Sequence, residues 1–169
     1  MRLVFRLFLI TAAAAALLVG IQAPNFVDQY TQRLDAHFIE VRNNLAPFQE
    51  IADRLHGGSL DKLIEQHAQS PDPTFHAEGD AIATMRDRYV RFQRQKAALD
   101  TELPQQLWWL ARQGDHDLLR ETGDRYSFGI LLDRTAIAAG AVAMLAVVLV
   151  IELLAGLIGL FRSPGLRRV

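Results

Sequence analysis

Five histidines, at positions 37, 56, 67, 76 and 116, are the residues of this chain best suited to binding a metal ion or transferring protons. Metal sites on helices repeat their ligands as paired histidines at i and i+4, or as Glu-x-x-His pairs on two helices. His37 shares a helix face with Glu40, and His116 stands between Asp115 and Asp117. One pair and one triplet do not supply three or four ligands, so we expect solvated histidines, no metal site and no cofactor.

Nucleophilic catalysis is also poorly supported. The chain has no cysteine, which excludes a thiol nucleophile, a disulfide framework and a thiolate zinc site. It contains no glycine-rich phosphate loop, no nucleophile elbow and no carboxylate pair on short loops. We therefore expect no catalytic residues, and an enzyme is the weakest of the possible function classes.

A basic segment between residues 86 and 96 carries a strong local charge. Its basic residues are Arg86, Arg88, Arg91, Arg94 and Lys96, opposed only by Asp87. On an antiparallel helix pair this face would meet acids of the preceding long helix, among them Asp35, Glu40, Glu50 and Asp53. The functional alternative is a polyanion or an acidic protein partner.

Glu152 is the carboxyl group in the least usual surroundings, because the uncharged run 135–151 precedes it and an apolar run continues to Phe161. Ionisable groups inside a membrane face protein or water. Thr11, in the first apolar segment, lies at a matching depth for a hydrogen bond. Glu152 then either takes part in proton transfer or contacts a partner helix. The alternatives are a neutral carboxyl group of no special function, or a residue near the headgroups of a span that ends early.

The elements that hold these residues divide the chain by composition. Residues 1–23 and 135–161 are apolar and long enough to cross a bilayer, so we predict a transmembrane helix in each. A cleaved signal peptide is the alternative for the first, but Ile21 and Pro24 make a poor cleavage site around Ala23. Small residues at four-residue spacing favour close packing of the spans, with each other or with another subunit: Ala12, Ala16, Gly20, Ala136, Ala139, Gly140 and Ala143.

Charge predicts the orientation of the two spans. Residues 22–134 hold 18 of the 19 acidic side chains but 13 of the 18 basic ones. The remaining basic residues lie at the two tips, Arg2 and Arg6 at one and Arg162, Arg167 and Arg168 at the other. The positive-inside rule places both termini in the cytoplasm, with 162–169 as a basic tail. In a bacterial envelope residues 24–134 are then periplasmic, which excludes nucleic acid as a partner.

Hydrophobic periodicity predicts an all-α domain between the spans. Residues 25–56 carry a coiled-coil seam at spacings of four and three: Val27, Thr31, Leu34, Phe38, Val41, Leu45, Phe48, Ala52 and Leu55. Pro24 suits the first turn of this helix and Gly57-Gly58 its end. Further helices are expected over about 59–69, capped by Ser59, over 74–103, capped by Thr74, and over 105–122. We predict that the two long helices form an antiparallel hairpin on the membrane.

Two neighbouring tryptophans, Trp108 and Trp109, follow this hairpin. If the chain returns to the bilayer near Leu103, their indole rings reach the headgroup level, where tryptophan is enriched. Alternatively, one packs inside the hairpin and the other covers its base. The segment 126–132 then leads along the membrane surface into the second span.

Directly after the first span, Pro24, Phe26 and the core Gln-Tyr-x-Gln-Arg-Leu at 29–34 resemble a small bacterial membrane-protein family known only as domain of unknown function family 2937. The resemblance implies a Gram-negative inner-membrane protein of two spans with no assigned activity, and it transfers no catalytic residues. By position, Gln29, Tyr30 and Arg33 lie one to two turns beyond the membrane. We predict that Tyr30 contacts headgroups and Arg33 a lipid phosphate or a partner's acid.

These observations favour a non-catalytic accessory or scaffold protein of the inner membrane, whose periplasmic hairpin binds another envelope protein or a second copy. The alternative is a periplasmic sensor that signals through a partner's transmembrane helices. Both hypotheses leave the partner, any ligand and the oligomeric state open.

Overall fold

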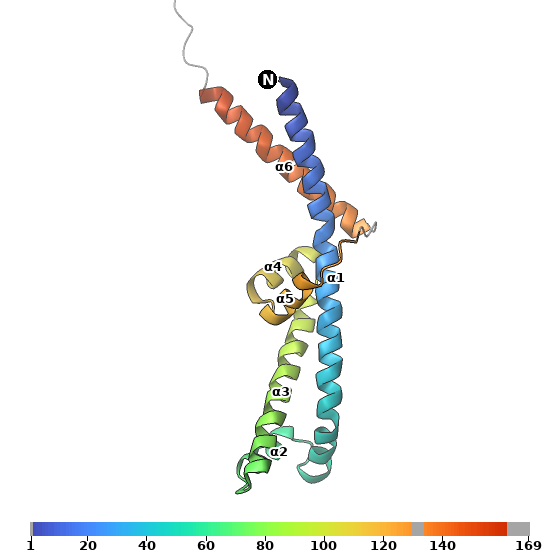
Figure 1. Cartoon of the computed structure of the whole chain (residues 1–169), viewed down its shortest axis with the longest axis vertical. Coiled ribbons are helices and arrows are strands. Elements are labelled where there is room, and N and C mark those ends of the chain that lie inside the picture. Colours follow the sequence, from blue (N-terminus) through green and yellow to red (C-terminus); the bar gives the residue numbers. More distant parts are fainter. Residues whose placement is uncertain (1, 130–133, 162–169) are drawn as a thin grey trace, which may run out of the picture. The chain divides into compact units, whose positions relative to one another are not determined.

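The computed structural model describes residues 2–129 and 134–161 and contains only helices in those ranges (Figure 1). The helices are α1 (Arg2–Leu55), α2 (Leu60–Ala68), α3 (Pro73–Leu99), α4 (Leu103–Gln113), α5 (His116–Asp124) and α6 (Arg134–Phe161). The all-α prediction is confirmed. The predicted basic tail at 162–169 and the end of the predicted surface segment at 130–132 lie outside the described residues.

The first helix differs from its prediction. A transmembrane helix ending at residue 23 and a second helix from residue 25 were expected, but α1 is one helix of 54 residues that continues through Pro24 and Pro47. Proline removes one backbone donor and crowds the preceding turn, which weakens a helix without always ending it. Buried neighbours on both sides of Pro24, Ile21 and Val27, hold the helical path in place.

The turns after α1 follow ordinary capping chemistry. Gly57 and Gly58 adopt φ values of 60° and 82°. Helices commonly end with a residue in this left-handed region, and glycine adopts it without steric strain. Ser59 caps α2, as predicted, by accepting a hydrogen bond from the Lys62 amide. Asp72, and not Thr74, caps α3: its carboxylate accepts from the Thr74 amide, and Pro73 takes the first helical position, which needs no donor.

The predicted helix over 105–122 is two helices. Helix α4 ends at Gln113, and Asp115 starts α5 by accepting hydrogen bonds from the amides of Asp117 and Leu118. Aspartate is a preferred N-cap residue, so Asp115 favours the start of a new helix at this point. Helix α3 likewise ends at Leu99 and not at residue 103, and Pro104 lies in the first turn of α4.

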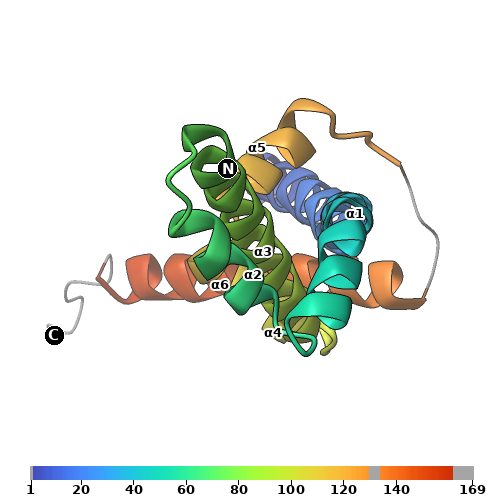
Figure 2. The same cartoon turned by 90° about the horizontal axis from the view of Figure 1, so that it is seen from below.

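The chain forms two compact units: unit 1 comprises residues 1–28 and 126–169, and unit 2 comprises residues 29–125. In unit 2, the second half of α1 and helix α3 run antiparallel, since Phe38 stacks on Tyr89 at 5.1 Å while the earlier Tyr30 reaches the later Gln95. Helix α2 packs beside α3 (Figure 2). The core residues of unit 2 are Tyr30, Leu34, Val41, Leu45, Ala52, Leu63, Ile82, Phe92, Leu99, Leu110 and Leu118. Leu55, the last residue of the predicted seam, is exposed.

In unit 1, the first part of α1 meets α6 at a crossing of small residues. A Cβ atom on Gly20 would lie 2.7 Å from the Ala143 Cβ, and one on Gly140 would lie 2.9 Å from the Leu17 carbonyl oxygen. The predicted close packing is thus a contact between the two apolar helices themselves. Among the described residues, α1 and α6 are the two helices long and apolar enough to cross a membrane. Their side chains beyond the crossing, such as Phe8 and Leu149, are exposed.

Candidate functional site

A groove of about 710 Å³ in unit 2 holds most of the predicted basic face. Its lining comes from α2, α3, α4 and the start of α5: Asp61, Arg86, Asp87, Val90, Arg91, Arg94, Gln95, Trp109, Gln113 and Asp115. We call it the α3–α4 groove. It combines charged groups with one half-buried indole, that of Trp109.

The arginines of the α3–α4 groove do not meet the acids that were expected. Arg86 pairs with Asp61 of α2 and with its neighbour Asp87, and these carboxylates raise its pKa. The Arg91 Nε lies 3.3 Å from the Asp115 carboxylate. Among the described residues, one of the predicted pairs with α1 is formed, between Lys96 and Asp35. The offset between packed helices, which a local charge pattern does not specify, selects these partners.

Two basic side chains of α3 have no acidic partner within the described part of the chain. The Arg88 guanidinium lies 5.6 Å from the centre of the Phe92 ring, and Arg94 is exposed on the wall of the α3–α4 groove. Arg91 also lies over Phe92, at 5.5 Å. The groove therefore presents uncompensated positive charge at Arg94, beside hydrogen-bonding amides and an aromatic ring.

Tyr30 is fully buried behind this groove, so the prediction that it contacts lipid headgroups is wrong. Its hydroxyl donates to the Gln95 side-chain oxygen at 2.6 Å and accepts from the Asp115 amide at 3.1 Å. Burial raises the pKa of Tyr30 to about 12. A tyrosine has an apolar body and a polar tip, and here both are satisfied inside unit 2 instead of at a membrane surface.

Arg33 and Gln29 also act within the chain. The Arg33 guanidinium donates to the Gln29 carbonyl oxygen at 3.0 Å and to the Arg125 carbonyl oxygen at 3.3 Å, at the C-terminal end of α5. Gln29 is half-buried. A guanidinium at a helix C-terminus satisfies carbonyls that lack helical donors. The described contacts thus give Arg33 a helix-capping role, whereas a lipid phosphate or a partner's acid was the predicted partner.

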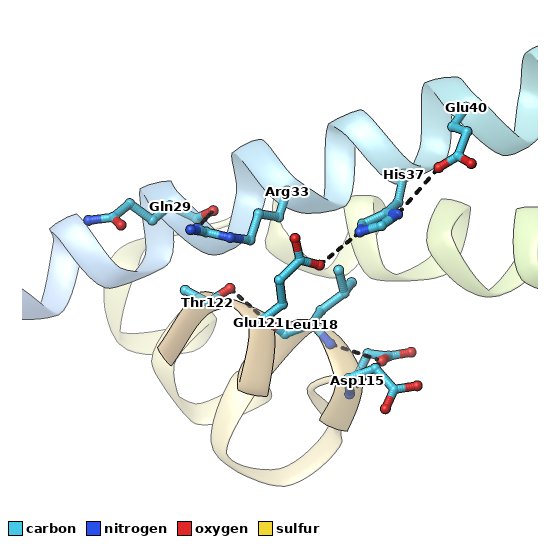
Figure 3. Close-up of polar contacts among 9 residues, drawn as sticks. Gln29, Arg33, His37, Glu40, Asp115, Leu118, Glu121 and Thr122 are labelled. Atoms are coloured by element: carbon cyan, nitrogen blue, oxygen red, sulfur yellow. Dashed lines mark hydrogen bonds and ion pairs between the residues drawn. The ribbon is translucent and has the colours of Figure 1, made fainter. Parts of the chain in front are cut away.

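His37 joins the same two helices one turn further along (Figure 3). Its Nε2 lies 3.0 Å from the Glu121 carboxylate of α5, and its Nδ1 lies 3.6 Å from Glu40. Because a carboxylate only accepts, Nε2 carries a proton, and this hydrogen bond lowers the pKa of Glu121. His67 is also partly buried, with Nδ1 2.8 Å from the Leu63 carbonyl oxygen. Both histidines are therefore packed, contrary to the expectation that they are solvated.

The two tryptophans take different positions. Trp109 lines the α3–α4 groove, while Trp108 is 61% exposed with the Arg112 guanidinium 3.9 Å above its ring. The Trp109 ring is thus half-buried and the Trp108 ring is exposed. No cluster of three or more metal-ligating side chains occurs among the residues that the structure describes.

Unit 1 contains a polar cluster that the sequence reasoning missed. The Asn25 amide, 5% exposed, donates to the Tyr126 hydroxyl at 3.0 Å and to the Ser127 carbonyl at 3.1 Å. The Tyr126 hydroxyl donates to the Gln22 side-chain oxygen at 2.7 Å, and its ring packs 5.9 Å from that of Phe26. An asparagine directly after the first apolar segment was the available signal.

Glu152 and Thr11 do not pair. The Thr11 hydroxyl donates to the Leu7 carbonyl of its own helix at 2.9 Å. Glu152 is exposed on α6, within a patch of that helix formed also by Leu145, Val148, Leu149, Leu153, Gly156 and Leu157. All of these residues come from one helix, so the patch is an uncovered helix face and not a cavity within the described chain.

The comparison with protein families confirms the resemblance that was expected from the residues after the first apolar segment. No curated protein and no solved structure matches this chain. The sequence matches the family described as Protein of unknown function (DUF2937) over residues 4–163, which takes in both apolar helices and the whole of unit 2. The chain therefore belongs to the DUF2937 family.

Proposed function

We propose that this protein is a non-catalytic adaptor of the bacterial inner membrane that binds an acidic segment of another envelope protein in the α3–α4 groove. The observation that carries the proposal is Arg94, an exposed cation on the groove wall without an acidic partner in the described residues. Trp109 and Gln113 beside it add an aromatic surface and a side-chain amide. Arginine with an aromatic neighbour is typical of residues that dominate protein interfaces.

The same proposal includes a membrane orientation. The apolar helices α1 and α6 cross the bilayer, both termini are cytoplasmic, and unit 2 is periplasmic. The exposed apolar side chains of unit 1 support contact with lipid, and the basic residues at the two tips of the sequence support the orientation. A periplasmic unit 2 meets proteins and lipid but not nucleic acid.

Site-specific photocrosslinking in cells tests the groove. A photoreactive residue at Gln113 should capture one dominant partner, because this exposed side chain lines the groove. Arg94→Glu should reduce that capture at least several-fold by reversing the charge that the partner's acid meets. Lys62→Glu is the matched control, since it makes the same charge change at an exposed position of α2 outside the groove. Equal capture by both variants would contradict the proposal.

A sensor is the second candidate, and the continuity of α1 favours it. One uninterrupted helix contains both the first apolar segment and the unit 2 residues that pack on α3. A continuous helix offers a path along which a displacement can be transmitted. Insertion of two glycines after Asp28 should then preserve capture at Gln113 but abolish any effect of the partner on alkylation of a single cysteine at Leu18. If the partner never alters that alkylation in the uninterrupted chain, the sensor role is excluded.

A further inference from the structure

The outward face of α6 carries a carboxyl group that nothing in the described chain covers. Glu152 is exposed, and so are Leu145 and Leu149, at 62% and 61%. Among the described side chains, a Cβ atom on Gly156 would meet nothing within 4 Å, so the helix surface is open one turn beyond Glu152. Leu145, Leu149, Glu152 and Gly156 follow spacings of four, three and four, which align them along one seam of a helix.

This seam faces away from the contact with α1. Ala143 touches the Gly20 position of α1, and nine residues separate Ala143 from Glu152. Nine residues at about 100° each amount to two and a half turns, so the two side chains lie on opposite faces of α6. Helix α1 therefore supplies no partner for Glu152, in keeping with the Thr11 hydrogen bond to its own helix.

The depth of Glu152 makes an uncovered state costly. It lies nine residues before Phe161, about 14 Å along the helix axis. Given the proposed membrane crossing of α6, the carboxyl group sits within hydrocarbon, where polar side chains turn to protein and not to lipid. A neutral carboxyl group both donates and accepts a hydrogen bond, so it is complementary to a second carboxyl group.

We infer that this seam is a self-association face: two copies of α6 pack in parallel, with their Glu152 carboxyl groups hydrogen-bonded to each other. A second copy is the occupant that matches best, because it crosses the membrane in the same orientation and brings an identical carboxyl group to the same depth. Gly156 permits the close approach that a two-fold contact of helices requires. The inference rests on the membrane anchoring in the proposed function, but not on the α3–α4 groove.

Disulfide scanning in native membranes tests the inference directly, because the chain contains no cysteine of its own. Single cysteines at Leu145, Leu149 and Gly156 should form dimers on mild oxidation, since equivalent positions face each other across a two-fold axis. Val150 and Leu154 are the matched controls: they are exposed at 53% and 54% and lie on the other side of α6. Disulfide yield should rise and fall with the helical repeat, high in the first set and low in the second.

Substitutions at Glu152 and Gly156 then distinguish the contribution of hydrogen bonding to the dimer from the contribution of close packing. Glu152→Gln retains a donor and an acceptor and should preserve the Leu149→Cys dimer. Glu152→Leu should reduce its yield by about three- to thirty-fold, the range expected for losing one hydrogen bond between helices in a membrane. Gly156→Leu should also reduce it, by blocking close approach.

Equal disulfide yields at all five positions, or no dimers at any of them, would overturn the inference, as would an adduct heavier than the dimer. Membrane fractionation of each variant distinguishes this failure from failure of the anchoring proposal. A chain found in the soluble fraction refutes both, whereas a membrane-bound chain without the periodic pattern refutes the self-association face and leaves the groove proposal intact.

Discussion

At the scale of single residues, buried polar atoms hold unit 2 together. The Tyr30 hydroxyl connects α1, the Gln95 side chain of α3 and the Asp115 amide that precedes α5. Gln95 is 4% exposed, and among the described residues the Tyr30 hydroxyl is the donor to its side-chain oxygen. A buried donor or acceptor that loses its partner pays the full cost of leaving water, so this hydroxyl should contribute more than its size suggests.

Tyr30→Phe should lower the free energy of unfolding by about 1–3 kcal/mol, because it leaves the Gln95 oxygen and the Asp115 amide without a partner. Urea unfolding of the detergent-purified chain measures the loss. Tyr89→Phe is the control, since the Tyr89 ring stacks on Phe38 but its hydroxyl bonds to no residue that the structure describes. Equal losses in the two variants would show that the buried hydroxyl contributes nothing specific.

The raised pKa of Tyr30 also predicts a pH dependence. In the unfolded chain the phenol ionises near its ordinary pKa of 10, whereas burial holds the pKa near 12 in the folded chain. Between these values the unfolded state has released its proton and the folded state has not, so the free energy of unfolding falls as pH rises from 10 toward 12. Tyr30→Phe should make this decline shallower. A decline of unchanged slope in urea titrations would contradict the assignment.

At the scale of helices, the start of α5 depends on one side chain with two roles. The Asp115 carboxylate accepts from two amides of α5 and pairs with Arg91. Asp115→Ala removes both roles and should cost about 1 kcal/mol for the cap alone. Asp115→Asn removes only the charge, because asparagine caps a helix about as well as aspartate, so it should cost less. If urea unfolding gives equal losses for both variants, the energy belongs to the ion pair and not to the cap.

The crossing of α1 and α6 in unit 1 gives a second prediction at this scale. Gly140→Leu would place a side chain at a position where even a single Cβ atom would lie 2.8–2.9 Å from Leu17 and Ile21. Such overpacking costs about 1–3 kcal/mol and should lower the melting temperature in detergent. Ala14→Leu, a similar enlargement at an exposed position of α1, should leave the melting temperature nearly unchanged. A stable Gly140→Leu variant would show that the helices do not cross there.

At the scale of the whole molecule, the division into two units separates apolar from charged surface. Unit 1 exposes large apolar side chains, while unit 2 carries nearly all of the acidic residues. Uncovered leucine and valine on this scale are stable against lipid but promote aggregation in water. This partition is the physical basis for proposing that unit 1 lies in a bilayer and unit 2 outside it.

Labelling of single cysteines with a membrane-impermeant maleimide checks the proposed orientation. Ala77→Cys, exposed in unit 2, should react in cells whose outer membrane alone has been permeabilised. Ser163→Cys, beyond the second apolar helix, should react only after the inner membrane is opened. The reverse pattern would place unit 2 in the cytoplasm and reopen the question of its partners.

Local patterns in the chain were enough to predict the features that depend on neighbouring residues. Apolar runs identified the two membrane-length helices, Ser59 was recognised as a cap, and the spacing of Leu34, Val41 and Ala52 identified buried positions. The small residues around Gly20 and Gly140 also pointed to close packing. Each of these features depends on side chains within a few turns of one helix, so the spacing of residues along the sequence is enough to predict it.

Contacts between segments that are distant in the sequence could not be predicted from local sequence patterns. Tyr30, expected at a membrane surface, is buried because Gln95 and Asp115 satisfy its hydroxyl. Arg91 pairs with Asp115. Asp115 is a helix cap because the segment predicted as one helix over 105–122 forms two helices, α4 and α5. Ion-pair and hydrogen-bond partners depend on the rotation and offset of packed helices. A shift of a few ångströms exchanges one partner for another while every local propensity stays the same.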